Sequence, residues 1–226
     1  MCYTLVMSNK RSYPDACGAA HAMDLIGERW ALLVARELML GPKRFTDLRA
    51  GLPNISPNVL TQRLEDLEEA AVVRRHKLPP PAATWVYELT DWGRELEPAL
   101  QVLGRWAARS PHKPQGMPIS LTSLILSFRT MFSSAAAEGL KANLELRLGD
   151  DRFHAVIDAG RFEIERGVPA EPDAVIETDA GTLAGLVYGG MKLADALQAG
   201  ALKVEGDKSV VKRFFGLFPL PALAPA

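Results

Sequence analysis

Cysteine, histidine and long hydrophobic runs are scarce in this sequence, and each scarcity excludes a class of protein. There are 2 cysteines, Cys2 and Cys17, and 4 histidines. No metal-site spacing groups them, so we expect neither a structural zinc site nor a disulfide scaffold. The apolar runs are far shorter than the roughly 20 residues that cross a bilayer. The opening segment MCYTLVMSNKR lacks the apolar core of a secretory signal. We therefore expect a cytoplasmic protein without cofactors and without membrane contact, and Met7 is a second candidate for the initiator.

Motifs of catalysis are also missing. The sequence has no G-x-S-x-G nucleophile turn, no phosphate loop and no dinucleotide-binding glycine pattern. What remains is an ordinary globular composition, with 48% hydrophobic and 23% charged residues. We predict that the protein is not an enzyme. The net charge of −1 means that any nucleic-acid binding must rely on a local basic surface.

The sequence is interrupted once by a proline-rich stretch, SPHKPQGMP, at residues 110–118. Helical patterns lie on both sides of it, so the stretch predicts a linker. We expect two domains, at residues 1–112 and 118–226, and a fold of the α+β class.

The first half predicts three helices followed by a β-hairpin. Apolar residues at helical spacing indicate a first helix that ends at Gly41-Pro42: Trp30, Leu33, Val34 and Leu38. A short helix at residues 45–50 follows. After a turn at residues 51–54, Ser56-Pro57 provides the N-cap and first position of a third helix. Its apolar stripe consists of Leu60, Leu64, Leu67 and Ala71.

Two strands come next, at residues 72–77 and 85–89, with a proline-rich loop between them that neither a helix nor a central strand accommodates. They predict a hairpin of the kind called a wing. Thr90 can cap a last helix whose apolar residues follow a 4-3-4-3 spacing suited to a partner helix: Trp92, Leu96, Ala99, Leu103 and Trp106.

This order of elements is that of a winged helix-turn-helix, which lays its third helix in the major groove of DNA. Asn58 and Gln62 can pair with adenine, with Thr61 beside them. Four carboxylates fill the rest of this helix, so only its N-terminal half can approach phosphates. Basic residues of the wing and of the segment before the second helix can neutralise phosphates. The expected DNA contacts are Lys43, Arg44, Ser56, Asn58, Thr61, Gln62, Arg63, Arg74, Arg75 and Lys77.

The alternative is that the leucines pack an ordinary helical domain and that the polar residues are a solvated face. A resemblance favours DNA binding. The segments IGERW, GPKRFTDL, LPNISPNVLTQRL and YELTDWG together resemble the HxlR-type family of winged-helix transcriptional regulators, over residues 15–108. The resemblance implies a homodimer on double-stranded DNA, with terminal helices at the interface.

The sequence departs from the family pattern at the wing. Ala71 stands where a glycine is usual, so we expect a differently built turn, and the proline-rich wing tip makes minor-groove contact by the tip doubtful. Cys17 matches the cysteine that senses oxidants or electrophiles in some members. A small packing residue is the other interpretation, since no basic residue adjoins Cys17 in sequence.

The second half predicts an amphipathic helix from Leu121, four strands of an antiparallel meander, two short helices, a strand LKVEG and a last helix that includes Phe218. The segments DAGTLAGLVYGG and ALKVEGDKSVVKRFF resemble sterol-carrier-protein-type lipid-binding domains over residues 120–218. The resemblance implies an antiparallel sheet covered by helices, with a tunnel for an acyl chain or other hydrophobic ligand.

Candidate lining residues are Phe128, Phe132, Leu186, Met191, Phe214 and Phe218. Each can equally be core, because an aromatic stripe usually packs a sheet. We predict a one-component regulator whose second domain binds a hydrophobic molecule that modulates DNA binding. The alternatives are a second domain that serves only structure or dimerisation, and a thiol-based sensor that acts through Cys17.

Overall fold

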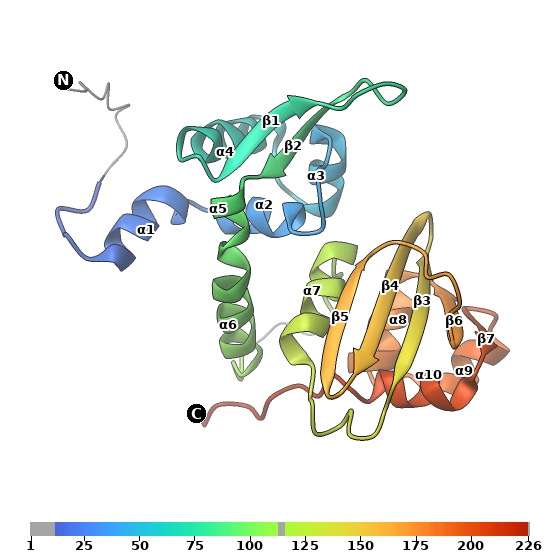
Figure 1. The fold of residues 1–226 in the computed structure, drawn as a ribbon. Coiled ribbons are helices and arrows are strands. Elements are labelled where there is room, and N and C mark those ends of the chain that lie inside the picture. Colours follow the sequence, from blue (N-terminus) through green and yellow to red (C-terminus); the bar gives the residue numbers. More distant parts are fainter. Residues whose placement is uncertain (1–11, 113–115, 226) are drawn as a thin grey trace. The chain divides into compact units, whose positions relative to one another are not determined.

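A computed structural model describes residues 12–112 and 116–225, so the predictions about Cys2 and Met7 lie outside the described residues. The chain forms two compact units that divide between Glu97 and Pro98. Figure 1 shows helices and a small hairpin in the first, and a sheet with helices in the second. Together they make an α+β protein.

Four helices build most of the first unit: α1 (Gly18–Ile26), α2 (Ala31–Leu38), α3 (Phe45–Gly51) and α4 (Pro57–Glu69). The sequence did not predict α1. Trp30 precedes α2 instead of belonging to it, with a left-handed φ of 79°. As predicted, Ser56 caps α4, and its hydroxyl oxygen accepts a hydrogen bond from the Val59 N–H at 3.3 Å.

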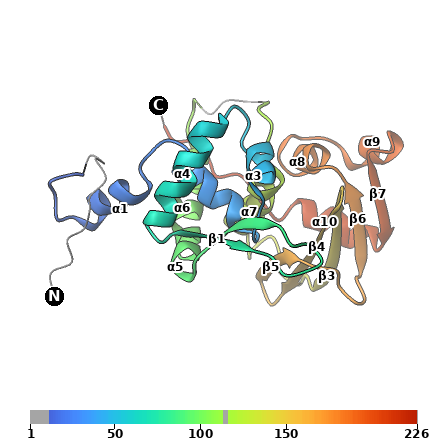
Figure 2. The ribbon, with the colours of Figure 1, turned by 90° about the horizontal axis from the view of Figure 1, so that it is seen from above.

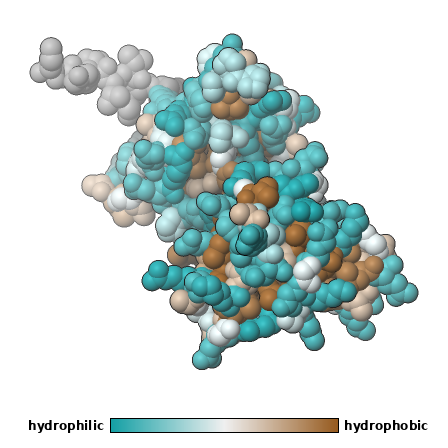
Figure 3. Space-filling view, turned by 45° about the vertical axis from the view of Figure 1, so that its right-hand side comes forward, coloured by the Kyte–Doolittle hydropathy of each residue, from teal (hydrophilic) through white to brown (hydrophobic). Residues whose placement is uncertain are grey.

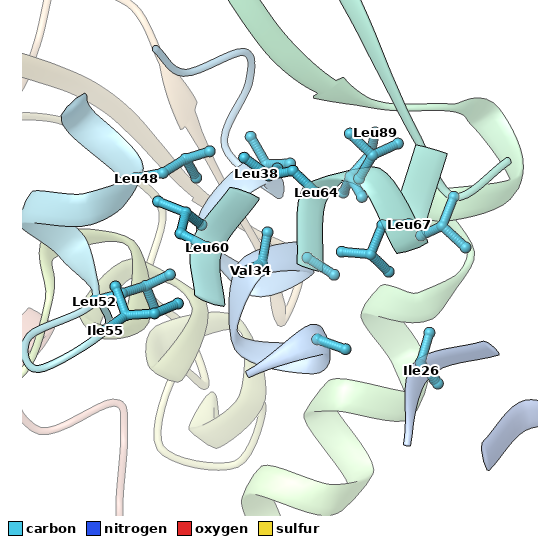
Figure 4. Close-up of a cluster of buried hydrophobic side chains, with 14 residues drawn as sticks. Ile26, Val34, Leu38, Leu48, Leu52, Ile55, Leu60, Leu64, Leu67 and Leu89 are labelled. Atoms are coloured by element: carbon cyan, nitrogen blue, oxygen red, sulfur yellow. The ribbon is translucent and has the colours of Figure 1, made fainter. Parts of the chain in front are cut away.

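The core of the first unit forms where α4 packs across α2 and α3. Leu60, Leu64 and Leu67 are buried, as the leucine stripe predicts. Figure 4 shows these side chains gathered with Val34 and Leu38 of α2. Because the leucines occupy one side of α4, the opposite side of the helix is left to solvent.

The wing consists of β1 (Val73–Lys77) and β2 (Trp85–Leu89), paired antiparallel with Arg75 opposite Tyr87. Lys43 extends this sheet, because its backbone exchanges two hydrogen bonds with Tyr87. Both predicted strands are confirmed to within one residue.

The turn before the wing corrects one expectation. Ala71 has a φ of 56°, so the left-handed conformation that favours glycine is kept, although the residue has a side chain. The Thr90 hydroxyl donates to the Ala71 carbonyl at 2.7 Å and accepts from the Gly93 N–H at 3.0 Å. Any Cβ on Gly93 would lie 2.1 Å from the Val72 carbonyl oxygen. These contacts explain why threonine stands at position 90 and glycine at position 93.

The helix predicted after Thr90 is two helices, α5 (Asp91–Arg94) and α6 (Leu96–Ala108). No residue of α6 is buried. Its apolar side chains Val102, Leu103 and Trp106 are exposed, Trp106 by 73%. These apolar residues of α6 therefore form a stripe on the surface and do not pack inside this chain.

The second unit holds the remaining elements, with α6 largely assigned to it. Its helices are α7 (Leu121–Met131), α8 (Ala180–Tyr188), α9 (Leu193–Gln198) and α10 (Lys208–Phe215). Its strands are β3 (Ala142–Leu148), β4 (Asp151–Asp158), β5 (Arg161–Arg166), β6 (Ala174–Thr178) and β7 (Leu202–Gly206). They form a sheet in the order β5-β4-β3-β6-β7.

The predicted antiparallel meander is wrong at one junction, because β3 and β6 are parallel and the sheet is mixed. The residues within one strand do not identify the direction of its partner, so the apolar pattern of β3 and of β6 did not reveal this pairing. Helices α8 and α10 lie on one face of the sheet in Figures 1 and 2. On the other face Glu145, although buried, pairs with Arg147 at 2.8 Å.

Phenylalanine rings fill the space between the sheet and its helices. Phe128 stacks on Phe218 at 4.5 Å between ring centroids and meets Phe214 edge-on at 5.9 Å. Phe218 lies beyond the end of α10, so its predicted place in the last helix is wrong. All three are buried.

The surface of the molecule is mainly polar on the face that Figure 3 shows. Apolar residues form separate small patches on this face. Within the described ranges, no helix has both the length and the apolar character needed to cross a membrane.

Candidate nucleic-acid interface

The exposed side of α4 presents the polar residues predicted to read bases. Asn58, Thr61 and Gln62 are all exposed in its first turns, opposite the buried leucines. The Gln62 side-chain amide donates to Asp66 Oδ1 at 3.1 Å. The Gln62 side chain is therefore held by a neighbour on its own helix.

Three of the predicted phosphate contacts form ion pairs inside the first unit. Lys43 Nζ lies 2.7 Å from Glu37 Oε2, and the Glu37 side chain is 1% exposed. Arg63 Nη1 lies 3.2 Å from both Asp66 and Glu28. Lys43 and Arg63 therefore each lie beside carboxylates of the same unit.

Arg74 is the third of these, on the outer side of the wing. Its Nη2 lies 2.8 Å from Glu88 Oε2, and Arg94 reaches the other oxygen of Glu88 at 2.7 Å. Burial raises the pKa of Glu88, but Arg74 and then Arg94 outweigh it, so the pKa lies below its usual value. The carboxyl is consequently charged and partly neutralises both guanidinium groups.

The other three basic residues among the predicted contacts are exposed: Arg44, Arg75 and Lys77. Among the described residues no ion pair engages them. Arg44 is the N-cap residue of α3, where its N–H donates to Asp47 Oδ2 at 3.2 Å. Arg75 lies over the rings of Trp85 and Tyr87. The guanidinium and ammonium groups of these three residues thus lie at the surface without a described carboxylate partner.

Two acidic and two aromatic residues matter here that sequence reasoning missed. Glu37 and Glu88 hold the basic side chains described above, and Trp85 and Tyr87 lie under Arg75. Side chains alternate between the two faces of a strand, so the sequence could have shown that Arg74 and Arg75 lie on opposite faces of the hairpin. Their partners depended on the strand register, which the proline-rich loop concealed.

Cys17 lies at the N-terminus of α1. The thiol is free and exposed. The N–H groups of Ala19 and then Ala20 lower the pKa of Cys17, because the amides of a helix N-terminus favour a negative charge. No basic residue beside Cys17 in the sequence signals this lowered pKa, because its cause lies in helix α1, which was not predicted.

The six candidate ligand-lining residues of the second unit do not surround either of two hollows on its surface. One hollow is lined by small, apolar and charged residues that include Ala135, Lys141 and Asp158. The other includes Arg152 and Lys203. Of the six candidates, Phe128, Leu186, Phe214 and Phe218 are buried, Phe132 is half-buried, and Met191 is exposed by 43%.

Helix α3, a tight turn, helix α4 and the β1–β2 hairpin define a winged helix-turn-helix protein. Comparison with known proteins narrows this class. Residues 25–114 match the family model described as HxlR-like helix-turn-helix. The chain is 40% identical over 86 residues to the uncharacterized HTH-type transcriptional regulator YvaP of Bacillus subtilis, which is 38% of this chain and 80% of that protein. The HTH-type transcriptional regulator YodB of the same organism is 38% identical over 86 residues, 38% of this chain and 77% of YodB. The chain belongs to the HxlR-like helix-turn-helix family of transcriptional regulators.

The second unit matches a different model, described as alkyl sulfatase C-terminal, over residues 118–223. A solved structure of a double mutant of the sec-alkyl sulfatase PisA1 is 18% identical, with a TM-score of 0.39. The likeness covers 46% of this chain and 19% of that one. The resemblance to sterol carrier proteins therefore stays a prediction.

Proposed function

We propose that this protein is a transcriptional regulator that binds duplex DNA as a homodimer, with the N-terminal half of α4 in the major groove. The supporting observation is the exposed row of Asn58, Thr61 and Gln62 on the side of α4 opposite its buried leucines. Amide side chains at this place can read adenine, and the helix N-terminus favours nearby phosphate.

In this proposal, basic residues outside ion pairs contact the phosphate backbone of the DNA. Arg44 lies at the start of α3, and Arg75 and Lys77 lie on the wing, so phosphates on two sides of the reading helix can be neutralised. Ser56 can donate its hydroxyl proton to a phosphate while its oxygen caps α4. Lys43, Arg63 and Arg74 shape this surface through their ion pairs.

The homodimer is supported by the exposed apolar stripe of α6. Val102 is 69% exposed and Trp106 is 73% exposed. A second copy of the chain packed against α6 would remove this apolar area from water. Two DNA half-sites would then be read symmetrically.

Selection of bound duplexes from a random pool tests DNA binding directly. We expect enrichment of an inverted repeat, because two copies related by a twofold axis read two equal half-sites. Failure of the wild-type chain to enrich any sequence would contradict the proposed function. Enrichment of an unrepeated site would contradict only the dimeric part.

For the second unit, the proposal is that a bound hydrophobic molecule changes the affinity of the protein for DNA. Arg109 links α6 to the end of the chain, since its Nε donates to the Ala222 carbonyl and its carbonyl accepts from the Ala224 N–H at 2.8 Å. A molecule that changes the packing of this unit would thus act on a helix we place at the dimer interface. Native mass spectrometry of the purified chain detects a retained lipid, and operator affinity measured with and without added fatty acid tests the coupling.

Thiol sensing through Cys17 is a second candidate function, favoured by its exposure and its lowered pKa. We expect the reaction with iodoacetamide to depend on pH with a midpoint below that of a free cysteine. Loss of operator binding after treatment with a quinone, abolished by Cys17→Ser, would support sensing. Equal loss in the Cys17→Ser variant would contradict it.

A further inference from the structure

Arg74 and Arg75 are neighbours on β1, yet their guanidinium groups meet opposite chemical surroundings. On one face of the hairpin, Arg74 is held by the carboxylate of Glu88 at 2.8 Å. On the other face, Arg75 lies over two aromatic rings. Successive residues of a strand point to opposite faces, so this contrast follows from the strand itself.

The rings under Arg75 come from the partner strand. The carbon at the centre of the guanidinium lies 4.8 Å from the ring centroid of Trp85 and 5.8 Å from that of Tyr87. Tyr87 is directly opposite Arg75 in the register, and Trp85 is the next residue on the same face. Cations at these distances are attracted to the negative face of an aromatic ring.

Trp85 is an unusual residue for its position. It is 52% exposed, whereas Val73 and Leu89 at the other end of the same face are buried in the core. Its indole therefore lies outside the packed interior of the unit. The Trp85 ring contacts the Arg75 guanidinium. We therefore look for the role of Trp85 in its effect on Arg75.

We propose that Trp85 is a positioning residue that holds the Arg75 guanidinium ready to bind a DNA phosphate. Aromatic carbons accept no hydrogen bond in the plane of the guanidinium, so the N–H donors of Arg75 remain available to phosphate oxygens. A side chain already restrained over a ring loses less rotamer freedom when it binds. Arg74 differs, because its Nε and Nη2 donate to the Glu88 carboxylate, which also offsets its charge. The inference rests on the proposed DNA-binding function.

The test is a double-mutant cycle measured by fluorescence anisotropy on the selected duplex, at several salt concentrations. We expect Trp85→Ala to weaken binding roughly three- to tenfold, and Trp85→Phe to retain most of the affinity. Arg75→Ala should weaken binding and lower the salt slope by about one. In the Arg75→Ala background, Trp85→Ala should have little further effect, because its role requires the guanidinium.

Arg74→Ala provides the matched background, in which the effect of Trp85→Ala should be as large as in the wild-type chain. Thermal unfolding of each variant verifies that the hairpin is folded. Equal losses from Trp85→Ala with and without Arg75 would overturn the inference, and so would wild-type affinity in Trp85→Ala. In both cases the wild-type chain still binds DNA and the proposed function stands. A wild-type chain that selects no duplex overturns both.

Discussion

The two units use their aromatic residues in opposite ways. In the first unit Trp85 and Trp92 are exposed, and no aromatic residue described there belongs to the buried core. In the second, Phe128, Phe153 and Phe214 are buried. Leucines suffice where three helices pack closely, whereas large rings fill the wider space between helices and a sheet. Exposed aromatic residues such as Trp85 can act on a partner, while the buried rings of the second unit stabilise the fold.

Removal of a buried ring from the second unit is the most sensitive test of this difference between the units. Phe128→Ala should lower the free energy of unfolding by about 3–5 kcal/mol, since the ring is fully buried among other rings. Chemical denaturation measures the change. Met191→Ala, at an exposed position, is the control and should cost less than about 1 kcal/mol. A small loss for Phe128→Ala would mean that the ring faces a cavity, as ligand lining requires.

The next effect concerns the ion pair between Lys43 and Glu37. Lys43→Ala should destabilise the chain by about 1–3 kcal/mol, because it removes one of the two cations that pair with the buried Glu37 carboxylate, while Arg36 remains at 2.9 Å. The measurement is again denaturation, with DNA affinity determined in parallel. Arg44→Ala is the matched control and should weaken DNA binding with little change in stability. The opposite outcome for the two variants would reassign Lys43 as a phosphate contact.

Base reading should be sensitive to Asn58. Asn58→Ala should reduce the preference for the selected sequence over a single-base variant by about 1–3 kcal/mol. Gln62→Ala should reduce it less, since this amide must first leave Asp66. Competition titrations with the two duplexes give both values. If only Gln62→Ala alters the preference, α4 enters the groove in a different register.

The smallest effect tests the turn that leads into the wing. Ala71→Gly should stabilise the chain by about 0.5–1 kcal/mol, because glycine adopts a φ of 56° without strain from a Cβ. Ala70 has a φ of −75°, so Ala70→Gly should destabilise it by a similar amount. Thermal unfolding of the two variants measures this difference. Equal effects would show that backbone conformation does not govern the turn.

Much of the first unit could be predicted because its signals are local. The Ser56-Pro57 start of α4, its leucine stripe and the two wing strands are each contained within a few residues. Helix α1 was missed, and with it the cause of the lowered pKa of Cys17. The strands of the second unit were also predictable, but the parallel pairing of β3 and β6 depends on residues far apart in sequence.

The sequence by itself determined where α3, α4 and the wing form, and which side of α4 is polar, because helical and strand periods depend on neighbouring residues. Only the tertiary structure decided which basic residues remain available. Lys43, Arg63 and Arg74 meet carboxylates brought close by packing, whereas Arg75 meets the ring of Trp85. Charge follows from the residue type, but its partners follow from distances that the folded chain alone establishes.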